Sequence, residues 1–157
     1  MRPDEYVRAG AIVLESYRVL PGHVVEPDYE RELADAASRA AVAEVAVAVD
    51  DTGAVVGCVT YVPDAANPYA EFDDPDASGF RMLGVDPAVQ GSGAGRALVQ
   101  WCVERATADG KHRILIHSTP WMTGAHAMYD HFGFARRSDL DWEPRPGIVL
   151  WGFGLEL

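Results

Sequence analysis

Cysteine is scarce in this sequence: only Cys58 and Cys102 occur among 157 residues. Neither lies in a cluster of His or Cys, so we expect small buried hydrophobic side chains rather than a disulfide framework or a metal site. No apolar run reaches roughly 18 residues, which excludes a membrane-spanning helix. The start, Met1–Glu5, lacks the charged and apolar stretches of a signal peptide, so a cytoplasmic location is expected.

Basic residues are also few, with 13 Lys and Arg against 24 Asp and Glu, for a formal net charge of −11. Such a surface repels phosphate polymers, so nucleic acid is excluded as a partner. A cationic small molecule or a basic peptide would be attracted. The alternative, that the acidity only favours solubility, stays open.

Internal repeats and low-complexity tracts are absent, and the length suits one domain covering residues 1–157. Helical periodicity predicts helices over 4–18 and 28–41, separated by a break at Pro21-Gly22. Alternation and turn residues predict a hairpin of strands 44–49 and 55–62, a loop over 63–79 and a strand over 80–85. The remaining expected elements are a helix over 93–108, a strand over 113–118, a helix over 123–132 and final strands over 136–141 and 148–155.

This order predicts an α/β (α+β) fold, in which a mixed sheet of about six to seven strands is flanked by about four helices. The segment 80–118 is a strand–helix–strand unit. Its two strands are therefore expected to be parallel, with a right-handed connection.

A glycine-rich segment follows the strand 80–85 and opens the helix after it; it reads Gln90-Gly91-Ser92-Gly93-Ala94-Gly95-Arg96. Glycines allow positive φ and a close approach of the backbone to a ligand. The first turn of a helix leaves N–H groups unpaired, and these can bind a phosphate. An acidic protein can thus bind an anion locally through backbone donors, with Arg96 as a nearby cation.

Three kinds of phosphate loop compete for this segment. A P-loop requires Gly-Lys-Ser/Thr, which is missing here, and a dinucleotide loop requires a glycine where Arg96 stands. The third pattern, Gln/Arg-x-x-Gly-x-Gly/Ala, is satisfied by Gln90, Gly93 and Gly95. An enzyme of nucleotide phosphates remains the weaker alternative.

Two further motifs accompany this loop: the strand and turn Met82-Leu83-Gly84-Val85-Asp86-Pro87, and the helix from Ala125 to Phe134, which reads Ala-His-Ala-Met-Tyr-Asp-His-Phe-Gly-Phe. Together with the loop, they resemble the GNAT family, the Gcn5-related N-acetyltransferases, over residues 42–157. The resemblance implies the acyl-CoA N-acyltransferase fold. It also implies transfer of the acetyl group of acetyl-CoA to a primary amine, with no metal.

The resemblance also implies roles for individual residues. In the family, the strand before the loop splays from its neighbour, and the pantetheine arm pairs with the positions of Leu83, Gly84 and Val85. The loop, with Gln90, Gly91, Ser92, Gly93, Ala94, Gly95 and Arg96, would take the diphosphate of coenzyme A. Tyr129 matches the tyrosine that protonates the leaving thiolate; the alternative, from its helix face alone, is core packing.

The general base is less defined by the motifs. His117 occupies a strand position where some relatives have a glutamate, and a neutral imidazole could take the proton of an ammonium group. The alternatives are a structural role for this histidine, a base among Glu71, Asp73, Asp74 and Asp76, or a chain of waters.

The sequence departs from the family pattern at two places. Met122 stands where the family often has an asparagine that binds the pantetheine arm, and only Met1-Arg2-Pro3 precedes the first helix, where the family has a strand. In the family, the acceptor pocket is formed by the N-terminal helices, the loop near residues 63–79 and the final hairpin. A small-molecule amine or a peptide N-terminus is the expected acceptor, and homodimers are common. A non-catalytic module that binds acyl-CoA is the alternative function.

Overall fold

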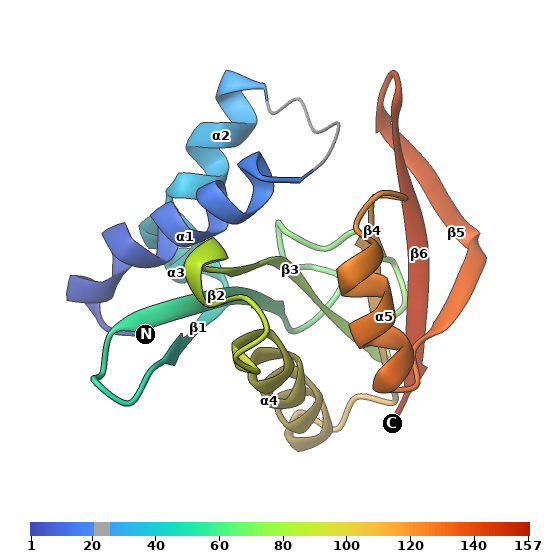
Figure 1. Ribbon diagram of the computed structural model, residues 1–157. Helices are drawn as coiled ribbons and strands as arrows, with labels where there is room; N and C mark the ends of the chain where they lie inside the picture. The colour runs from blue at the N-terminus through green and yellow to red at the C-terminus, as the bar shows by residue number, and fades with distance from the viewer. Residues whose placement is uncertain (21–25) are drawn as a thin grey trace.

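The computed structural model describes residues 1–20 and 26–157, which form a mixed six-stranded sheet with the order β1-β2-β3-β4-β6-β5 (Figure 1). The strands are β1 (Glu44–Val49), β2 (Val55–Val62), β3 (Ala77–Val85), β4 (Arg113–Ser118), β5 (Ala135–Arg145) and β6 (Ile148–Glu156). The helices are α1 (Tyr6–Arg18), α2 (Pro27–Ala34), α3 (Ala36–Val42), α4 (Ala94–Ala108) and α5 (Thr123–His131). The predicted fold class is confirmed, including the β1–β2 hairpin and the parallel pairing of β3 with β4.

Helices cover both faces of the sheet at β2. Every residue of this strand is buried, whichever face its side chain points to. Successive side chains of a strand point to opposite faces. Cys58 packs in one core with α1, α2 and α3, whereas Val59 and Tyr61 pack in a second core with α4 and α5. Both cysteines are buried and free, as expected.

The prediction of one helix over 28–41 is wrong, because the segment forms α2 and α3 with a break at Asp35. Asp35 has φ −90° and ψ 73°, and its carboxylate accepts a 2.9 Å hydrogen bond from the Ser38 N–H. The residue thus ends one helix and caps the next, a role that aspartate fills well. The predicted break at Pro21-Gly22 lies outside the described residues.

Strand β3 begins at Ala77 rather than at residue 80, because Ala77 and Ser78 pair with Arg113 and Ile114 of β4. Within the described residues, no strand precedes β1, so the sheet lacks the first strand that the family usually has. No helix of the described ranges is long and apolar enough to cross a membrane.

Candidate active site

The strands β3 and β4 separate after a short pairing (Figure 1). A cavity opens beside the end of β3. The two strands are paired only at Ala77–Arg113 and Ser78–Ile114, although both continue for several residues. Met82 has φ 51°, a left-handed conformation that is uncommon for a residue with a side chain, at an irregularity of the β2–β3 register. Because the pairing with β4 ends at Ser78, the part of β3 from Leu83 onward has no strand partner on that side among the described residues.

The glycine loop leads from this strand into α4, and its backbone supplies free donors. Gly91 and Gly93 have φ values of +86° and +94°, and Gly93 is the N-cap of α4 without a side-chain capping bond. The N–H groups of Ala94, Gly95 and Arg96 donate to no backbone carbonyl in the described part of the chain. These groups are therefore available to an anion at the helix N-terminus.

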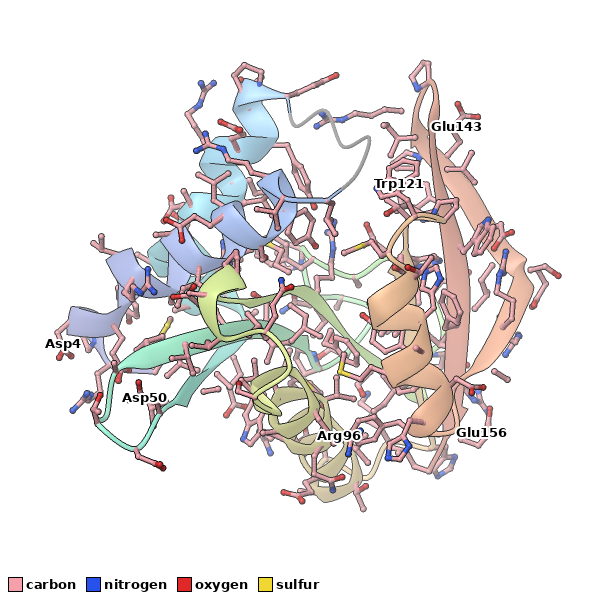
Figure 2. The ribbon with its side chains drawn as sticks, viewed as in Figure 1. Asp4, Asp50, Arg96, Trp121, Glu143 and Glu156 are labelled. Atoms are coloured by element: carbon pink, nitrogen blue, oxygen red, sulfur yellow. The ribbon has the colours of Figure 1, made fainter. Side chains whose placement is uncertain are left out.

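A cavity of about 710 Å³, here called the cofactor cavity, joins the splayed strand to the glycine loop. Figure 2 shows two of its side chains, Arg96 on α4 and Trp121 just before α5. Every residue expected to bind the cofactor lines it: Leu83, Gly84, Val85, Gln90, Gly91, Ser92, Gly93, Ala94, Gly95 and Arg96. The cavity is also lined by residues from Trp121 to Met128, which α4 and β4 separate from the loop in the sequence.

A second cavity of about 430 Å³, here called the acceptor cavity, meets the cofactor cavity at Tyr17 and Met122, which line both. Its walls come from α1 and α2, from the loop before β3, and from the β5–β6 hairpin. The lining includes Glu26, Tyr29, Glu32, Glu71, Arg81, His117, Ser118, Trp142, Arg145 and Leu150. These are the three segments that form the acceptor pocket in the family.

Ion pairs already engage most charges of the acceptor cavity. Glu71 Oε1 lies 2.9 Å from Arg81 Nη2, and Glu26 pairs with Arg145 at 2.7 Å. Although burial alone would lower the pKa of Arg81, the charge of Glu71 raises it on balance. Glu32 is half-buried and makes no ion pair with any described residue, so its carboxylate can receive a cation.

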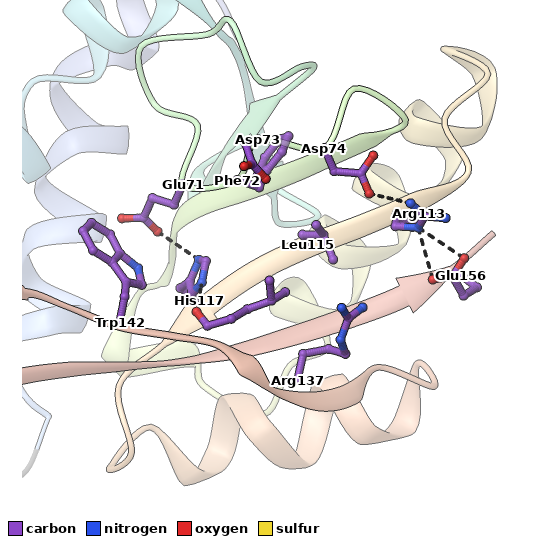
Figure 3. Close-up of a pocket in the computed structure, with 11 residues that line it drawn as sticks. Glu71, Phe72, Asp73, Asp74, Arg113, Leu115, His117, Arg137, Trp142 and Glu156 are labelled. Atoms are coloured by element: carbon purple, nitrogen blue, oxygen red, sulfur yellow. Dashed lines mark hydrogen bonds and ion pairs between the residues drawn. The ribbon is translucent and has the colours of Figure 1, made fainter.

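His117 is held by contacts at both ring nitrogens (Figure 3). Nε2 lies 2.9 Å from the Leu140 carbonyl oxygen, which can only accept, so this nitrogen carries the proton. Nδ1 lies 3.5 Å from Glu71 Oε2. Both ring nitrogens thus face oxygen atoms of the protein, and only 3% of the side chain is exposed, so the arrangement suits a residue that positions Glu71 and the β5 strand.

Two of the other three predicted acids lie beyond this histidine, in a hollow of about 710 Å³ beside β4 (Figure 3). Asp73 and Asp74 line this hollow and do not line the acceptor cavity. Asp74 pairs with Arg113, which also pairs with Glu156 at 3.2 Å. Asp76 lines neither space, so of the four acids proposed as bases only Glu71 lies at the acceptor cavity.

Tyr129 is buried, with 5% of its surface exposed, and lines neither cavity. Its ring packs against Phe80, Phe134 and Phe153 at centroid distances of 5.6 to 5.9 Å. Burial, with a smaller contribution from Cys102, raises the pKa of the phenol. Its helix neighbours Ala125 and Met128 do line the cofactor cavity, so Tyr129 lies directly behind that wall.

One polar pair at the site was not predicted. His126 Nε2 lies 3.1 Å from the hydroxyl of Ser118, which lines the acceptor cavity. The sequence contains no local signal for this contact, because the serine ends β4 and the histidine lies on α5. Among the described residues there is no group of three His, Cys, Asp or Glu that could hold a metal ion.

The fold and the site together define an α/β protein with a splayed strand, a helix N-terminus with free backbone N–H groups and an adjoining second cavity. The model of the acetyltransferase (GNAT) family matches residues 11–134, and the chain belongs to this family. It is 39% identical over 62 residues to a mycothiol acetyltransferase of Beutenbergia cavernae, a match that covers 38% of this chain and 21% of that protein. The chain thus spans about one fifth of the length of this curated relative.

Solved structures share the fold over the whole chain. A GCN5-related N-acetyltransferase from Kribbella flavida is 21% identical, with a TM-score of 0.73, over 100% of this chain and 95% of that one. A protein from Salmonella typhimurium, whose structure contains its cofactor acetyl-CoA, is 19% identical with a TM-score of 0.68, over 100% and 91% of the two chains. Acetyl-CoA is the cosubstrate of the family to which the chain belongs.

Proposed function

We propose that the protein is an N-acetyltransferase, which moves the acetyl group of acetyl-CoA to a primary amine of a small molecule or a peptide N-terminus. The observation that carries the proposal is the meeting of two cavities at Tyr17 and Met122. One cavity suits an anionic cofactor and the other a cationic amine. A direct transfer needs both reactants in contact, and holding them at one junction lowers the entropic cost of their encounter.

The cofactor cavity offers groups that suit both the diphosphate and the pantetheine arm of acetyl-CoA. The free N–H groups at the start of α4 would hold the diphosphate, with Arg96 as a neighbouring cation. The unpaired edge of β3 from Leu83 to Val85 would bind the amide-rich pantetheine arm like an added strand. When bound, acetyl-CoA supplies a thioester carbon that an amine can attack, and the Val85 N–H is our candidate to polarise its carbonyl oxygen.

The acceptor cavity favours a protonated amine. Its carboxylates Glu26 and Glu71 are neutralised by arginines, whereas Glu32 has no ion-pair partner in the described ranges. Tyr29, Trp142 and Leu150 provide apolar and aromatic surface beside this charge. We therefore infer an acceptor that combines a cationic nitrogen with an apolar or aromatic body.

Tyr129 is proposed as the group that stabilises the departing thiolate. Because burial raises its pKa, the phenol keeps its proton at neutral pH. The same shift makes the phenol a weaker acid, so a hydrogen bond donated to the sulfur suits it better than complete early proton transfer. To do so the hydroxyl must reach past Ala125 and Met128 into the cofactor cavity.

Free thiol release from acetyl-CoA, measured with a panel of primary amines, tests the proposal. We expect turnover with at least one primary alkylamine that carries an aromatic ring, and a Tyr129→Phe variant that binds acetyl-CoA normally but turns over roughly 100-fold more slowly. Binding of acetyl-CoA without turnover of any amine would instead support a non-catalytic acyl-CoA module. Stabilisation by ATP or NAD, at about 2.7 kcal/mol for ligand at 100 times its Kd, with none by acetyl-CoA, would favour an enzyme of nucleotide phosphates.

A further inference from the structure

Ser118 and His126 form a polar pair beside the junction of the two cavities. Ser118 is the last residue of β4, is 4% exposed and lines the acceptor cavity. Its hydroxyl oxygen lies 3.4 Å from the sulfur of Met122, which lines both cavities. The hydroxyl therefore lies where the amine of one cavity must meet the acetyl group of the other.

The direction of the hydrogen bond between the two side chains follows from their chemistry. Ser118 has one proton, and an imidazole nitrogen accepts it much more strongly than the thioether of Met122 does. His126 also makes a hydrogen bond with the backbone of Thr119 that raises its pKa, the effect of a donation from the ring to a carbonyl. The relay requires the neutral tautomer with its single N–H on Nδ1, in which Nε2, the nitrogen that faces Ser118, carries a lone pair.

The surroundings of His126 favour this neutral form. Its ring stacks on Trp151 at 5.7 Å and lies 4.9 Å from the ring of Phe153. The charged group that faces it is Arg136 of β5, whose guanidinium lies 4.9 Å from the Trp151 ring and pairs with Asp141. Burial, followed by this positive charge, lowers the pKa of His126 against the opposing hydrogen bond to Thr119.

We propose that Ser118 and His126 relay the proton of the acceptor amine, as the general base of the transfer. The acceptor enters as an ammonium ion and first gives one proton to Ser118 Oγ, which leaves the neutral amine that can attack. As the nitrogen–carbon bond then forms and the carbon–sulfur bond breaks, the thiolate leaves with the hydrogen bond from Tyr129, and the nitrogen gives its second proton to the same hydroxyl. Each time, the hydroxyl gives its own proton to His126 Nε2, so serine is regenerated and the imidazole becomes an imidazolium. Half-exposed His126 then releases this proton to water. The inference rests on the proposed acetyl transfer and replaces His117, whose nitrogens are both engaged, as the base.

Steady-state kinetics with acetyl-CoA and benzylamine test the relay in three variants. We expect Ser118→Ala and His126→Gln each to lower kcat roughly 100-fold, while the Kd for acetyl-CoA stays unchanged. The double variant should be no slower than either single one, because the two residues act as a unit. His131→Gln, an exposed histidine on the same helix, is the matched control and should keep wild-type rates.

The pH profile separates a base from a structural contact. In the wild type, kcat/KM should fall with decreasing pH only below the ordinary histidine value of 6.5, as His126 becomes protonated. This acidic limb should vanish in His126→Gln. An unchanged limb in that variant, or its loss in a His117→Gln variant instead, would overturn the relay.

A measurement without any acceptor tests the geometry separately. Nitrogen-15 NMR of the histidine rings in the acetyl-CoA complex, assigned with the His126→Gln variant, reports which ring nitrogen carries the proton. We expect a bare Nε2 at pH 7, and a protonated Nε2 would refute the relay even if acetyl transfer is established. If the wild type binds acetyl-CoA but acetylates no amine of the panel, the proposed function itself fails and the relay with it.

Discussion

Gly93 offers a sharp test of the anion site, because its conformation has a matched counterpart elsewhere in the chain. Gly93 has φ +94° at the N-cap of α4, and Gly53 has φ +84° in the turn between β1 and β2. A Cβ at either position would meet no heavy atom within 4 Å. Replacement by alanine therefore introduces backbone strain at both sites without a steric clash.

The strain has a predictable size. An L-residue in the left-handed region costs about 1 to 2 kcal/mol, so Gly93→Ala and Gly53→Ala should lose similar stability. For a domain of this length, each kcal/mol lowers Tm by roughly 2 to 4 °C. Only Gly93 lies among the donors of the cofactor cavity. A hydrogen bond to a charged group contributes about 1.5 to 3 kcal/mol, so displacing one N–H should weaken acetyl-CoA binding roughly 10- to 150-fold.

Calorimetric titration with acetyl-CoA and thermal unfolding of the two variants separate these effects. We expect equal decreases in Tm, and a weakened Kd in Gly93→Ala alone. If both variants unfold at lower temperature but bind acetyl-CoA like the wild type, the backbone at the start of α4 does not hold the diphosphate. If Gly53→Ala also loses affinity, the effect is global destabilisation rather than a local contact.

Two further predictions concern the N-terminal helices that border the site. Asp35→Ala should lower the free energy of unfolding by about 1 kcal/mol, because it removes the side-chain cap that Ser38 engages. Hydrogen bonds that Ser38 donates lower the pKa of Asp35. The loss of stability in Asp35→Ala should therefore be fully present above the ordinary pKa of 3.8 and vanish as the pH falls through the lowered pKa. Urea unfolding of both proteins at several pH values measures this loss. Gly84→Ala should cost about 1 to 3 kcal/mol, since its Cβ would lie 2.8 Å from Val13 Cα of α1 and overpack this contact. Urea unfolding should show this loss of stability, and calorimetry should show a weakened affinity for acetyl-CoA. A Gly84→Ala variant as stable as the wild type would contradict the tight packing of α1 on β3.

The elements that could be predicted from sequence are those with strong local signals. The alternating valines of β1, the Asp-Asp-Thr-Gly turn after it and the glycine loop before α4 each specify their structure within about ten residues. The interruption of the second helix escaped prediction, because residues 28–41 keep a helical apolar pattern through the break. The side chain of Asp35 competes with the helix backbone for hydrogen bonds. In the structure it caps α3, and the helix does not continue through this position.

The cofactor side of the site follows from contiguous motifs, whereas the acceptor side depends on contacts between distant segments. His117 is defined by Leu140, 23 residues further along the chain, and by Glu71 on a loop. A periodic pattern cannot anticipate either partner. The positive φ of Met82 coincides with a register shift between β2 and β3, and nothing about methionine predicts it.

Net charge alone gives a misleading picture of which ligands the protein can hold. With 24 acidic residues, the chain as a whole repels anions. Among the described residues that line the cofactor cavity there is nevertheless no carboxylate, and Arg96 is the charged side chain. Three carboxylates instead line the adjoining acceptor cavity, where a cation would enter. Because the proposed donors for the anion are backbone N–H groups that no surface composition alters, an acidic exterior is compatible with the phosphate site that we propose at the start of α4.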